Sequence, residues 1–456
     1  MNIIIVGDGK VGYTLADYLS QDGHDVTIVD NNRKALHKAS ETLDVMCVMG
    51  SGANVRTLIE AGAEDADVII AVTTNDEMNM VCCLMAKQLG AKYSIARIRD
   101  PEYTEGLTML LDKLDIDQVI NPERATAQEI SRLLRLPFAI NIESFAHGRV
   151  EMVEFRVDEG DQITGVPLSK LHGKFPHVQF TAVQRDGEAI IPDGSFQIRA
   201  NDRVYVTGDR ESVSKFFKLL GKDTQRVKSA VLIGGGHISY YLAKIIAGMG
   251  IKLRIVEINE EKCRALSERL DDVVILHGDG TDQELLDSED VAECGALICL
   301  TDRDEENLIT GLYGVRVGIR KVVVKVNRLN TFDMLGDIGI DSVVSPKLTT
   351  AHEILRSVRA LSQSQKSSVI EKVYGILGGK VEASEFTALE GAPYLSIPLS
   401  KLKIKKGVLV SLLVRNRRCI IPFGGDSILK GDSVILVARA GEVVNLEDAF
   451  DTEGLR

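Results

Sequence analysis

A long internal repeat constrains this chain more than any other feature of its sequence. Residues 2–135 align with residues 229–360 at an offset of about 227, with the same order of apolar runs and turns. A shorter unit repeats as well, since Pro167-Leu168-Ser169-Lys170-Leu171 recurs as Pro398-Leu399-Ser400-Lys401-Leu402. The chain is therefore a duplicated module of two unlike units, and a short-period solenoid is excluded.

The longer unit alternates short apolar runs with segments of helical spacing. In the first copy these runs are rich in β-branched residues and almost continuously apolar, as strands are when both faces of a parallel sheet are covered. This pattern predicts an α/β fold with a doubly wound, Rossmann-like parallel sheet. The strand candidates are Asn2–Val6, Val26–Asp30, Val45–Met49, Asp67–Val72, Tyr93–Ile98 and Gln118–Ile120, and the helix candidates are Val11–Ser20 and Asn75–Leu89.

The shorter unit has a hairpin signal in place of long helices. Asp186-Gly187 favours a tight turn between two strands. Val150–Val157 and Asn201–Val206 are further strand candidates, and Glu211–Leu220 is a helix candidate. The unit is therefore predicted to be a small α+β domain.

The duplicated order predicts four domains joined by polar linkers. The linker candidates, Leu361–Ser368 and the less distinct Lys222–Lys228, lack any hydrophobic period. The predicted domains are residues 1–135 and 228–360 for the Rossmann-like units and residues 138–221 and 371–456 for the α+β units.

Composition excludes several classes of protein. The net charge of −12 disfavours a nucleic-acid binder, because such proteins neutralise phosphates with Lys and Arg. Apolar runs such as Val408–Val414 fall far short of the roughly 20 residues of a membrane-spanning helix, and the N-terminal residues are not typical of a signal peptide. Seven cysteines without CxxC or His-rich spacing indicate reduced, packed thiols in a cytoplasmic protein and no metal site.

The first glycine-rich turn predicts a nucleotide site. Gly7-Asp8-Gly9-Lys10-Val11-Gly12 is a complete GxGxxG that follows a strand candidate and opens a helix candidate. The first Gly permits a tight turn, the second lets a pyrophosphate approach the backbone, and the third lets helix pack on strand. Asp30 ends the second strand, where a carboxylate can accept hydrogen bonds from ribose hydroxyls. These residues favour NAD(H) or an adenosine nucleotide without a 2′-phosphate.

The second copy carries an altered version of this motif. It reads Gly234-Gly235-Gly236-His237-Ile238-Ser239, with Glu257 as the acidic residue. Ser239 replaces the third Gly and adds bulk between helix and strand, so we expect binding with altered affinity or ligand preference. His237 is either a phosphate contact or a solvent-facing loop residue.

Further candidates follow the strands at the same edge of each sheet. Hydroxyl groups in the loops after the fourth strands are either ligand contacts or helix caps. Basic residues at the ends of the fifth strands are either phosphate contacts or members of surface ion pairs. The loop Gly278–Thr281 carries an acid that its counterpart Gly50–Ala53 lacks. These candidates are Thr73, Thr74, Arg97, Asp279, Thr301 and Lys325.

The sequence offers no catalytic constellation. None of the eight histidines pairs with a carboxylate in a repeated position at a strand end, and no GKS/T loop, GxSxG elbow or HExxH helix occurs. We therefore predict a protein that is not an enzyme. An NAD-dependent oxidoreductase with a duplicated cofactor domain and a nucleotide sensor without a channel are the alternatives.

The repeated pairing of a GxGxxG unit with a small α+β unit resembles the TrkA family of Trk-type potassium uptake regulatory proteins. Gly7–Gly12, Asp30, the loop Thr73–Glu77, Arg97 and the repeated Pro-Leu-Ser-Lys-Leu and Ile-Ile-Pro patterns carry this resemblance over essentially the whole chain. In that family the units are called RCK or KTN N- and C-terminal domains.

The resemblance implies a cytoplasmic regulatory subunit, peripheral on the inner face of the plasma membrane. It implies NAD(H) or ATP/ADP as effectors and a membrane-embedded potassium-translocating partner similar to TrkH or TrkG. It further implies a tetrameric ring of identical chains, and no enzymatic turnover. Ser239 and the non-acidic loop Gly50–Ala53 depart from the pattern. The sequence therefore leaves open whether both sites take one ligand, which nucleotide activates, and whether the α+β units bind cyclic di-AMP.

Overall fold

The computed structural model describes residues 1–103, 114–222, 225–327, 339–340, 342–362, 368–377 and 379–451. By their internal contacts these residues form two compact units. The first unit contains Met1–Gln128, Gly236–Leu242 and Ser345–Val358, and the second contains the remainder.

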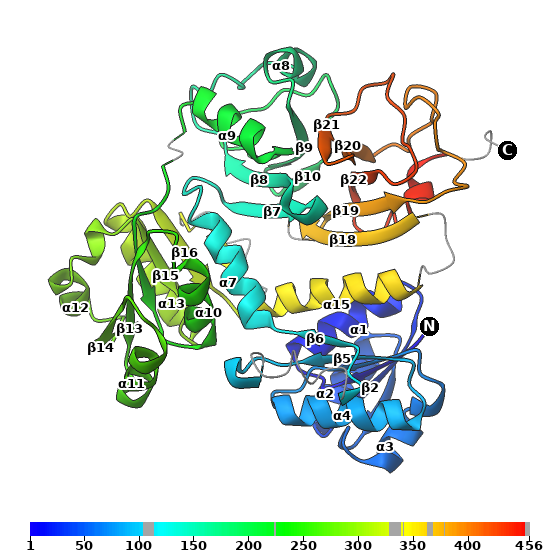
Figure 1. Cartoon of the computed structure of the whole chain (residues 1–456), viewed down its shortest axis with the longest axis vertical. Coiled ribbons are helices and arrows are strands. Elements are labelled where there is room, and N and C mark those ends of the chain that lie inside the picture. Colours follow the sequence, from blue (N-terminus) through cyan, green and yellow to red (C-terminus); the bar gives the residue numbers. More distant parts are fainter. Residues whose placement is uncertain are drawn as a thin grey trace. The chain divides into compact units, whose positions relative to one another are not determined.

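The first parallel sheet has the strand order β3-β2-β1-β4-β5-β6 (Figure 1). Its central strands are buried on both faces, as the continuous apolar runs predict. Asn32 and Asn75 cap the second and fourth helices by accepting backbone N–H groups of the first turn. The elements are β1 (Asn2–Val6), α1 (Lys10–Gln21), β2 (Asp25–Asp30), α2 (Arg33–Thr42), β3 (Met46–Met49), α3 (Val55–Glu60), β4 (Val68–Ala71), α4 (Asp76–Leu89), β5 (Tyr93–Arg97) and β6 (Gln118–Ile120), followed by α7 (Pro122–Leu133).

The second parallel sheet repeats this order as β14-β13-β12-β15-β16-β17. The same Rossmann-like topology thus occurs twice, which confirms the predicted α/β fold class. The elements are β12 (Ser229–Ile233), α10 (His237–Ile246), β13 (Lys252–Glu257), α11 (Glu260–Arg269), β14 (Val273–His277), α12 (Gln283–Ser288), β15 (Ala296–Cys299), α13 (Asp304–Arg316), β16 (Lys321–Lys325) and β17 (Ser342–Val344), followed by α15 (Pro346–Ser362).

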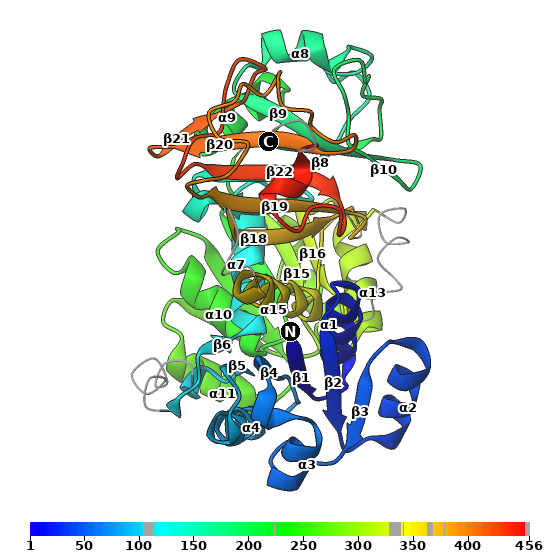
Figure 2. The ribbon, with the colours of Figure 1, turned by 90° about the vertical axis from the view of Figure 1, so that its right-hand side faces the viewer.

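Two segments of the second half complete the first compact unit. They are Gly236–Leu242, which opens α10, and Ser345–Val358, which forms most of α15. In both Figure 1 and Figure 2, α15 lies alongside α1. Within this unit Tyr241 Oη accepts a hydrogen bond from Asn121 Nδ2 at 2.8 Å, so a residue of α10 contacts the start of α7.

The two antiparallel sheets share one topology. The first has the order β10-β9-β11-β8-β7 and the second the order β18-β19-β22-β20-β21. The first comprises β7 (Asn141–Phe145), β8 (Val150–Arg156), α8 (Leu168–Lys174), β9 (Val178–Arg185), β10 (Glu188–Ile190), β11 (Arg203–Asp209) and α9 (Arg210–Leu219). The second comprises β18 (Ser368–Ile376), β19 (Val381–Ala388), β20 (Leu409–Arg415), β21 (Arg418–Ile420), β22 (Ser433–Arg439) and the short 3₁₀ helix Leu446–Ala449.

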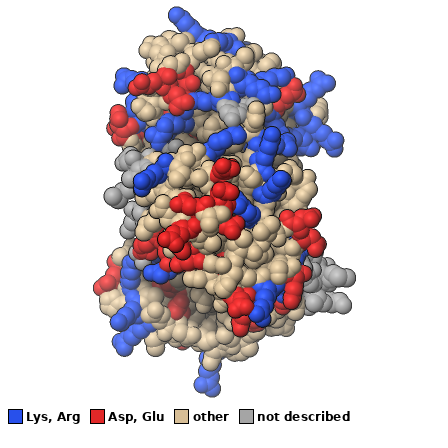
Figure 3. Space-filling view, turned by 90° about the vertical axis from the view of Figure 1, so that its left-hand side faces the viewer, with Lys and Arg blue, Asp and Glu red and all other residues tan. Residues whose placement is uncertain are grey.

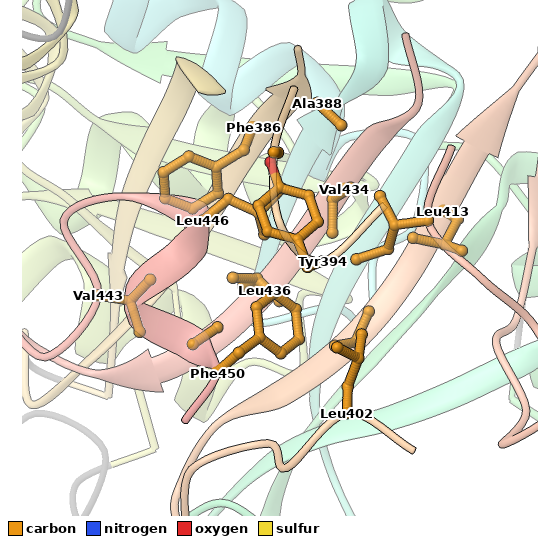
Figure 4. Packing of buried hydrophobic residues seen from close by; sticks show 14 of the residues in the cluster. Phe386, Ala388, Tyr394, Leu402, Leu413, Val434, Leu436, Val443, Leu446 and Phe450 are labelled. Carbon is orange, nitrogen blue, oxygen red and sulfur yellow. The ribbon is translucent and has the colours of Figure 1, made fainter. Parts of the chain in front are cut away.

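The helices that cover these two sheets differ. Where the first sheet has α8 and α9, the described part of the second has turns and one short 3₁₀ helix. The core of the second contains the fully buried rings of Tyr394 and Phe450, which lie 5.4 Å apart (Figure 4). The expectation of an α+β unit in both copies therefore fits the first copy more closely.

The two antiparallel sheets belong to one compact unit and share an apolar core. Phe145 and Met152 of the first sheet pack in one cluster with Ile376, Leu412 and Val437 of the second. The hairpin predicted at Asp186-Gly187 is present, with positive φ values of 51° and 76°. Figure 2 shows the two sheets stacked.

The predicted linkers coincide only partly with described irregular segments. Leu361 belongs to the end of α15 and Ser368 begins β18, while residues 363–367 between them lie outside the described residues. Residues 223–224 of the other linker candidate also lie outside them.

Surface and membrane features can be stated for the described residues alone. None of their helices has both the length and the apolar character needed to cross a bilayer. Lys and Arg side chains share the face seen in Figure 3 with Asp and Glu. All seven cysteines are free, and five of them are buried.

Candidate functional site

The first glycine-rich turn uses its three glycines for three different purposes. Gly7 has a φ of +107° and donates its N–H to Val29 O at 2.8 Å, which turns the chain out of β1. A Cβ on Gly12 would lie 1.8 Å from Gly7 O, so only glycine fits where α1 crosses the strand. A Cβ on Gly9 would meet nothing within 4 Å. The space beside Gly9 is therefore open at the N-terminus of α1, where a phosphate would bind.

Asp30 fixes this turn to the end of β2. Its Oδ2 accepts the backbone N–H of Asp8 at 2.6 Å and its Oδ1 accepts that of Asn32 at 2.7 Å. The motif predicts that Asp30 binds a ribose, but its spacing does not reveal this structural task. A carboxylate has about four acceptor positions, so hydrogen bonds from a ribose remain compatible with both amide contacts.

The side chain of Asp8 lies buried beneath the same turn. It is 8% exposed, and neither carboxyl oxygen has a hydrogen-bond partner. Burial, together with the nearby negative charge of Asp30, raises the pKa of Asp8 to about 6, while Lys38 opposes the shift. The first turn therefore contains a carboxyl group that titrates close to neutral pH.

The second turn repeats the backbone scheme. Gly234 has a φ of +102° and donates to Val256 O at 2.8 Å. Glu257 Oε2 accepts the N–H of Gly235 at 2.6 Å, and its Oε1 accepts that of Asn259 at 2.8 Å. Asp30 and Glu257 thus have the same structural task in the two sheets.

The two turns differ in what fills the space under the second residue of the motif. A Cβ on Gly235 would lie 2.6 Å from Leu266 Cδ1 and 3.2 Å from Glu257 Cβ. In the first copy the corresponding residues are Asp8, Ala39 and Asp30, so smaller neighbours leave room for a side chain. Ser239, at the position of Gly12, is fully buried. The exchange of Asp8 for Gly235 and that of Ala39 for Leu266 change side-chain volume in opposite directions.

A buried asparagine organises the loop after the fourth strand in each sheet. Asn79 Oδ1 accepts hydrogen bonds from the backbone N–H of Thr73 at 2.9 Å and from the hydroxyl of Thr73 at 2.7 Å. Asn79 Nδ2 donates a hydrogen bond to Arg97 O at 2.8 Å. Asn307 makes the matching contacts with Thr301 N at 2.8 Å and Lys325 O at 3.0 Å. Neither asparagine was predicted to be a functional residue, although the presence of Asn at the same place in both copies of the repeat indicates a shared role.

The hydroxyl groups in the loops after the fourth strands were predicted to be either ligand contacts or helix caps. The structure tests only the second possibility. Asn75, not Thr73 or Thr74, caps α4, with Met78 N donating to Asn75 Oδ1 at 2.6 Å. Asp76 in the first turn of α4 accepts the N–H of Arg99 at 2.8 Å. The threonine side chains are therefore not the caps, and their assignment as ligand contacts stays a prediction.

The two basic candidates have different surroundings. Lys325 is itself buried, and its Nζ lies 3.1 Å from a carboxylate oxygen of the exposed Asp302. Arg97 donates from Nη1 to Thr73 O at 3.5 Å, and its buried Nε has no partner. Burial lowers the pKa of Arg97, and Glu123 opposes this shift. Burial in turn raises the pKa of Glu123.

The remaining candidate residues lie at the starts of two helices and in one turn. Lys10 and His237 are exposed at the first positions of α1 and α10, while Val11 and Ile238 are buried beneath them. Asp279 accepts the N–H of Thr281 at 2.8 Å and its hydroxyl at 2.7 Å, so it stabilises its own turn. Among the described residues no group of three or more His, Cys, Asp or Glu side chains is placed to hold a metal ion.

Curated relatives match the chain over nearly its full length. A Trk system potassium uptake protein TrkA homolog 2 of Methanosarcina mazei is 33% identical, over 99% of this chain and 100% of the relative. The homolog of Archaeoglobus fulgidus is also 33% identical, with the same coverage. The TrkA protein of Azorhizobium caulinodans is 32% identical over 99% of this chain and 98% of its own.

Solved structures show the same fold at lower sequence identity. The GsuK RCK domain is 18% identical with a TM-score of 0.60, and covers 97% of this chain and 92% of that chain. The GsuK channel bound to NAD is 18% identical with a TM-score of 0.60, covering 97% and 77%. GsuK bound to ADP is 18% identical with a TM-score of 0.51, covering 80% and 70%.

Family models assign most of the chain. The TrkA-N domain matches residues 3–122 and 230–346, and the TrkA-C domain matches residues 152–221. These matches cover both parallel sheets and most of the first antiparallel sheet, of which β7 lies outside the matched residues. The chain belongs to the TrkA family of Trk system potassium uptake proteins.

Proposed function

We propose that this chain is the nucleotide-binding regulatory subunit of a Trk-type potassium uptake system. In this proposal it couples binding of NAD(H) or ATP/ADP to a membrane-embedded, potassium-translocating subunit similar to TrkH or TrkG. The ligand shifts a conformational equilibrium by binding one state more tightly, and the membrane subunit responds to that shift. The four predicted domains, at residues 1–135, 138–221, 228–360 and 371–456, are part of the proposal.

The geometry of the first turn is the observation that carries this proposal. Gly12 lets α1 begin directly against Gly7, and the space beside Gly9 stays open. Free N–H groups and the positive end of the helix dipole then face that space, which suits a pyrophosphate. The fold is shared with the GsuK channel bound to NAD and with GsuK bound to ADP.

The carboxylates at the strand ends favour a nucleotide whose ribose carries no 2′-phosphate. Asp30 and Glu257 lie at the ends of β2 and β13, and each is held by two backbone amides. A fixed negative charge at this place accepts hydrogen bonds from a ribose diol and repels a 2′-phosphate. NAD(H), ATP and ADP meet this requirement, and NADP(H) does not.

Calorimetry on a matched pair of variants tests nucleotide binding at the first turn. Gly9→Ala places a single Cβ in the space beside the backbone, so we expect NADH and ATP binding to weaken less than with a larger side chain. Gly9→Leu fills the space that a pyrophosphate needs, and we expect it to abolish binding at one of the two sites. If both variants bind the same total amount of NADH and ATP as the unmodified chain, the first turn is not a nucleotide site.

The membrane partner is tested by co-purification. The regulatory proposal requires that the tagged chain retain a multi-span potassium-translocating protein from detergent-solubilised membranes, with retention that changes on adding nucleotide. A nucleotide sensor without a channel would retain none. A gene for a multi-span transporter next to the gene of this chain would support the same conclusion.

Exposed apolar residues at matching places support assembly into a ring of four chains. Val81 on α4 is 39% exposed, and Ile309, at the corresponding place on α13, is 65% exposed. Burying such residues between chains is favourable, by roughly 1 kcal/mol or more for each side chain. We expect light scattering to show a tetramer and Ile309→Asp to dissociate it. A monomer at micromolar concentration with and without nucleotide would contradict the ring.

The oxidoreductase alternative has no support in the chain or its relatives. The relatives are named as potassium uptake proteins, and the chain is a regulatory protein of their family, not an enzyme. A change in nicotinamide absorbance on incubation with NADH and candidate substrates would contradict this conclusion.

A further inference from the structure

One buried acidic group in the first glycine-rich turn has no structural task. Asp8 is 8% exposed, and both oxygens of its carboxyl group lack a hydrogen-bond partner. A buried polar group without a partner is costly, because the water that it loses is not replaced. The backbone N–H of Asp8 holds Asp30, but an alanine or glycine would supply that N–H equally well.

The groups around Asp8 come from three neighbouring elements. Asp30 at the end of β2 adds a second negative charge, Lys38 on α2 adds a positive charge, and Cys47 on β3 is a neighbouring thiol. Lys38 Nζ lies 4.9 Å from the ring centroid of Tyr13, a favourable cation–π distance. With burial, these surroundings place the pKa of Asp8 at about 6. Its charge therefore changes near the pH of a cell interior.

Asp8 also lies next to the open space of the turn. It directly precedes Gly9, beside which an added Cβ would meet nothing within 4 Å. An ionised Asp8 would place a second negative charge beside Asp30 in the turn that the phosphates of a nucleotide approach, and negative charges at short range repel strongly when partly buried. A proton on Asp8 removes this repulsion and leaves the hydrogen bonds of Asp30 intact.

We propose that Asp8 makes the first nucleotide site proton-linked, so that an anionic nucleotide binds more tightly when Asp8 carries a proton. This inference rests on the proposed function, because it requires a nucleotide at the first turn. The second turn has Gly235 at this position, and Leu266 and Glu257 occupy the space beside it. The second site therefore lacks this carboxyl group, and Asp8→Asn separates the pH dependence of the first site from any that arises at the second.

The sign and size of the effect follow from linkage. A bound phosphate favours the protonated carboxyl group, so binding takes up a proton, and affinity falls as the pH rises through the pKa of the free chain. If the nucleotide raises the pKa of Asp8 from about 6 to about 7, affinity is about sixfold lower at roughly pH 7.5 than at roughly pH 5.5.

Calorimetry of NAD⁺ binding to the full chain tests the proposal. NAD⁺ is the probe because its pyrophosphate keeps the same charge over this pH range. Binding is measured at both pH values, in buffers of different ionisation enthalpy, so that proton uptake is obtained directly. We expect proton uptake and the pH-dependent affinity in the unmodified chain, and neither of them at the first site in Asp8→Asn. Glu60→Gln removes an exposed carboxylate at the end of α3 and should retain both effects.

The outcomes separate this inference from the proposed function. Binding with the same pH profile and proton uptake in Asp8→Asn as in the unmodified chain would overturn the proton linkage and leave nucleotide binding intact. Absence of NAD⁺, ADP and ATP binding at every pH would overturn both. Asp8→Gly reproduces the residue of the second copy, and its pH-independent affinity would show that the result does not depend on the asparagine side chain.

Discussion

The two glycine-rich turns share one backbone scheme but have different interiors. In both, a strand-end carboxylate accepts two backbone N–H groups, one of them from the residue after the first glycine. The first turn combines this with a buried Asp8 and a small Ala39, whereas the second combines it with Gly235 and Leu266. After duplication, then, the hydrogen bonds that shape the turn were kept, while the side chains that set its charge and volume changed together.

We expect the largest loss of stability from a side chain at the third glycine of the first motif, where the second copy has Ser239. Gly12→Ala places a Cβ 1.8 Å from Gly7 O, a backbone atom that cannot move aside, so we expect a loss of about 2 kcal/mol or more. Amide hydrogen exchange in β1 and α1 measures the loss locally. Gly9→Ala, whose Cβ meets nothing, is the control. Equal protection in both variants would show that helix–strand spacing does not require Gly12.

The second prediction concerns variants in which the second turn receives the residues of the first. Gly235→Asp drives a Cβ to within 2.6 Å of Leu266 Cδ1 and should destabilise the second sheet by about 1–3 kcal/mol. Leu266→Ala in the same chain makes the space that Ala39 provides in the first copy and should recover part of that loss. A double-mutant cycle on amide exchange in β12 measures the coupling. Strictly additive effects would mean that Asp8 and Ala39 did not change together.

Sequence reasoning identified the turns, the strands and the duplication, because each follows from local patterns. Glycines at fixed spacing and buried β-branched runs report backbone conformation directly, and β1 and β6 begin and end at the predicted residues. The tasks of Asn79 and Asp76 depend on contacts between strand ends that are far apart in sequence. The burial of Asp8 depends on the size of Ala39, and no periodicity reveals such a pair.

The third prediction concerns the strand-end acids as ribose contacts. Asp30 and Glu257 differ by one methylene, so a ribose cannot lie at the same depth in both sites. We expect Asp30→Ala and Glu257→Ala to weaken different nucleotides, or one nucleotide to different extents, by about tenfold or more for the affected ligand. Asn32→Ala and Asn259→Ala keep both backbone amides and the acids, and serve as matched controls. Titrations in which both acidic variants lose the same ligand by the same factor would show that the two sites are equivalent.

The smallest effect concerns the stability of the first sheet and its dependence on pH. The pKa of Asp8 is raised from 3.8 to about 6 in the folded chain, so protonated Asp8 favours folding. That contribution is complete below the unfolded value and is lost as the pH rises through about 6. Asp8→Asn cannot ionise, so near pH 7 it should be more stable than the unmodified chain, and this difference should disappear toward pH 4. Amide exchange in β1 at both pH values measures this. Because Gly235 occupies the same place in the second copy, the amides of β12 should show no such difference, and a similar change in both strands would locate the titrating group outside the first turn.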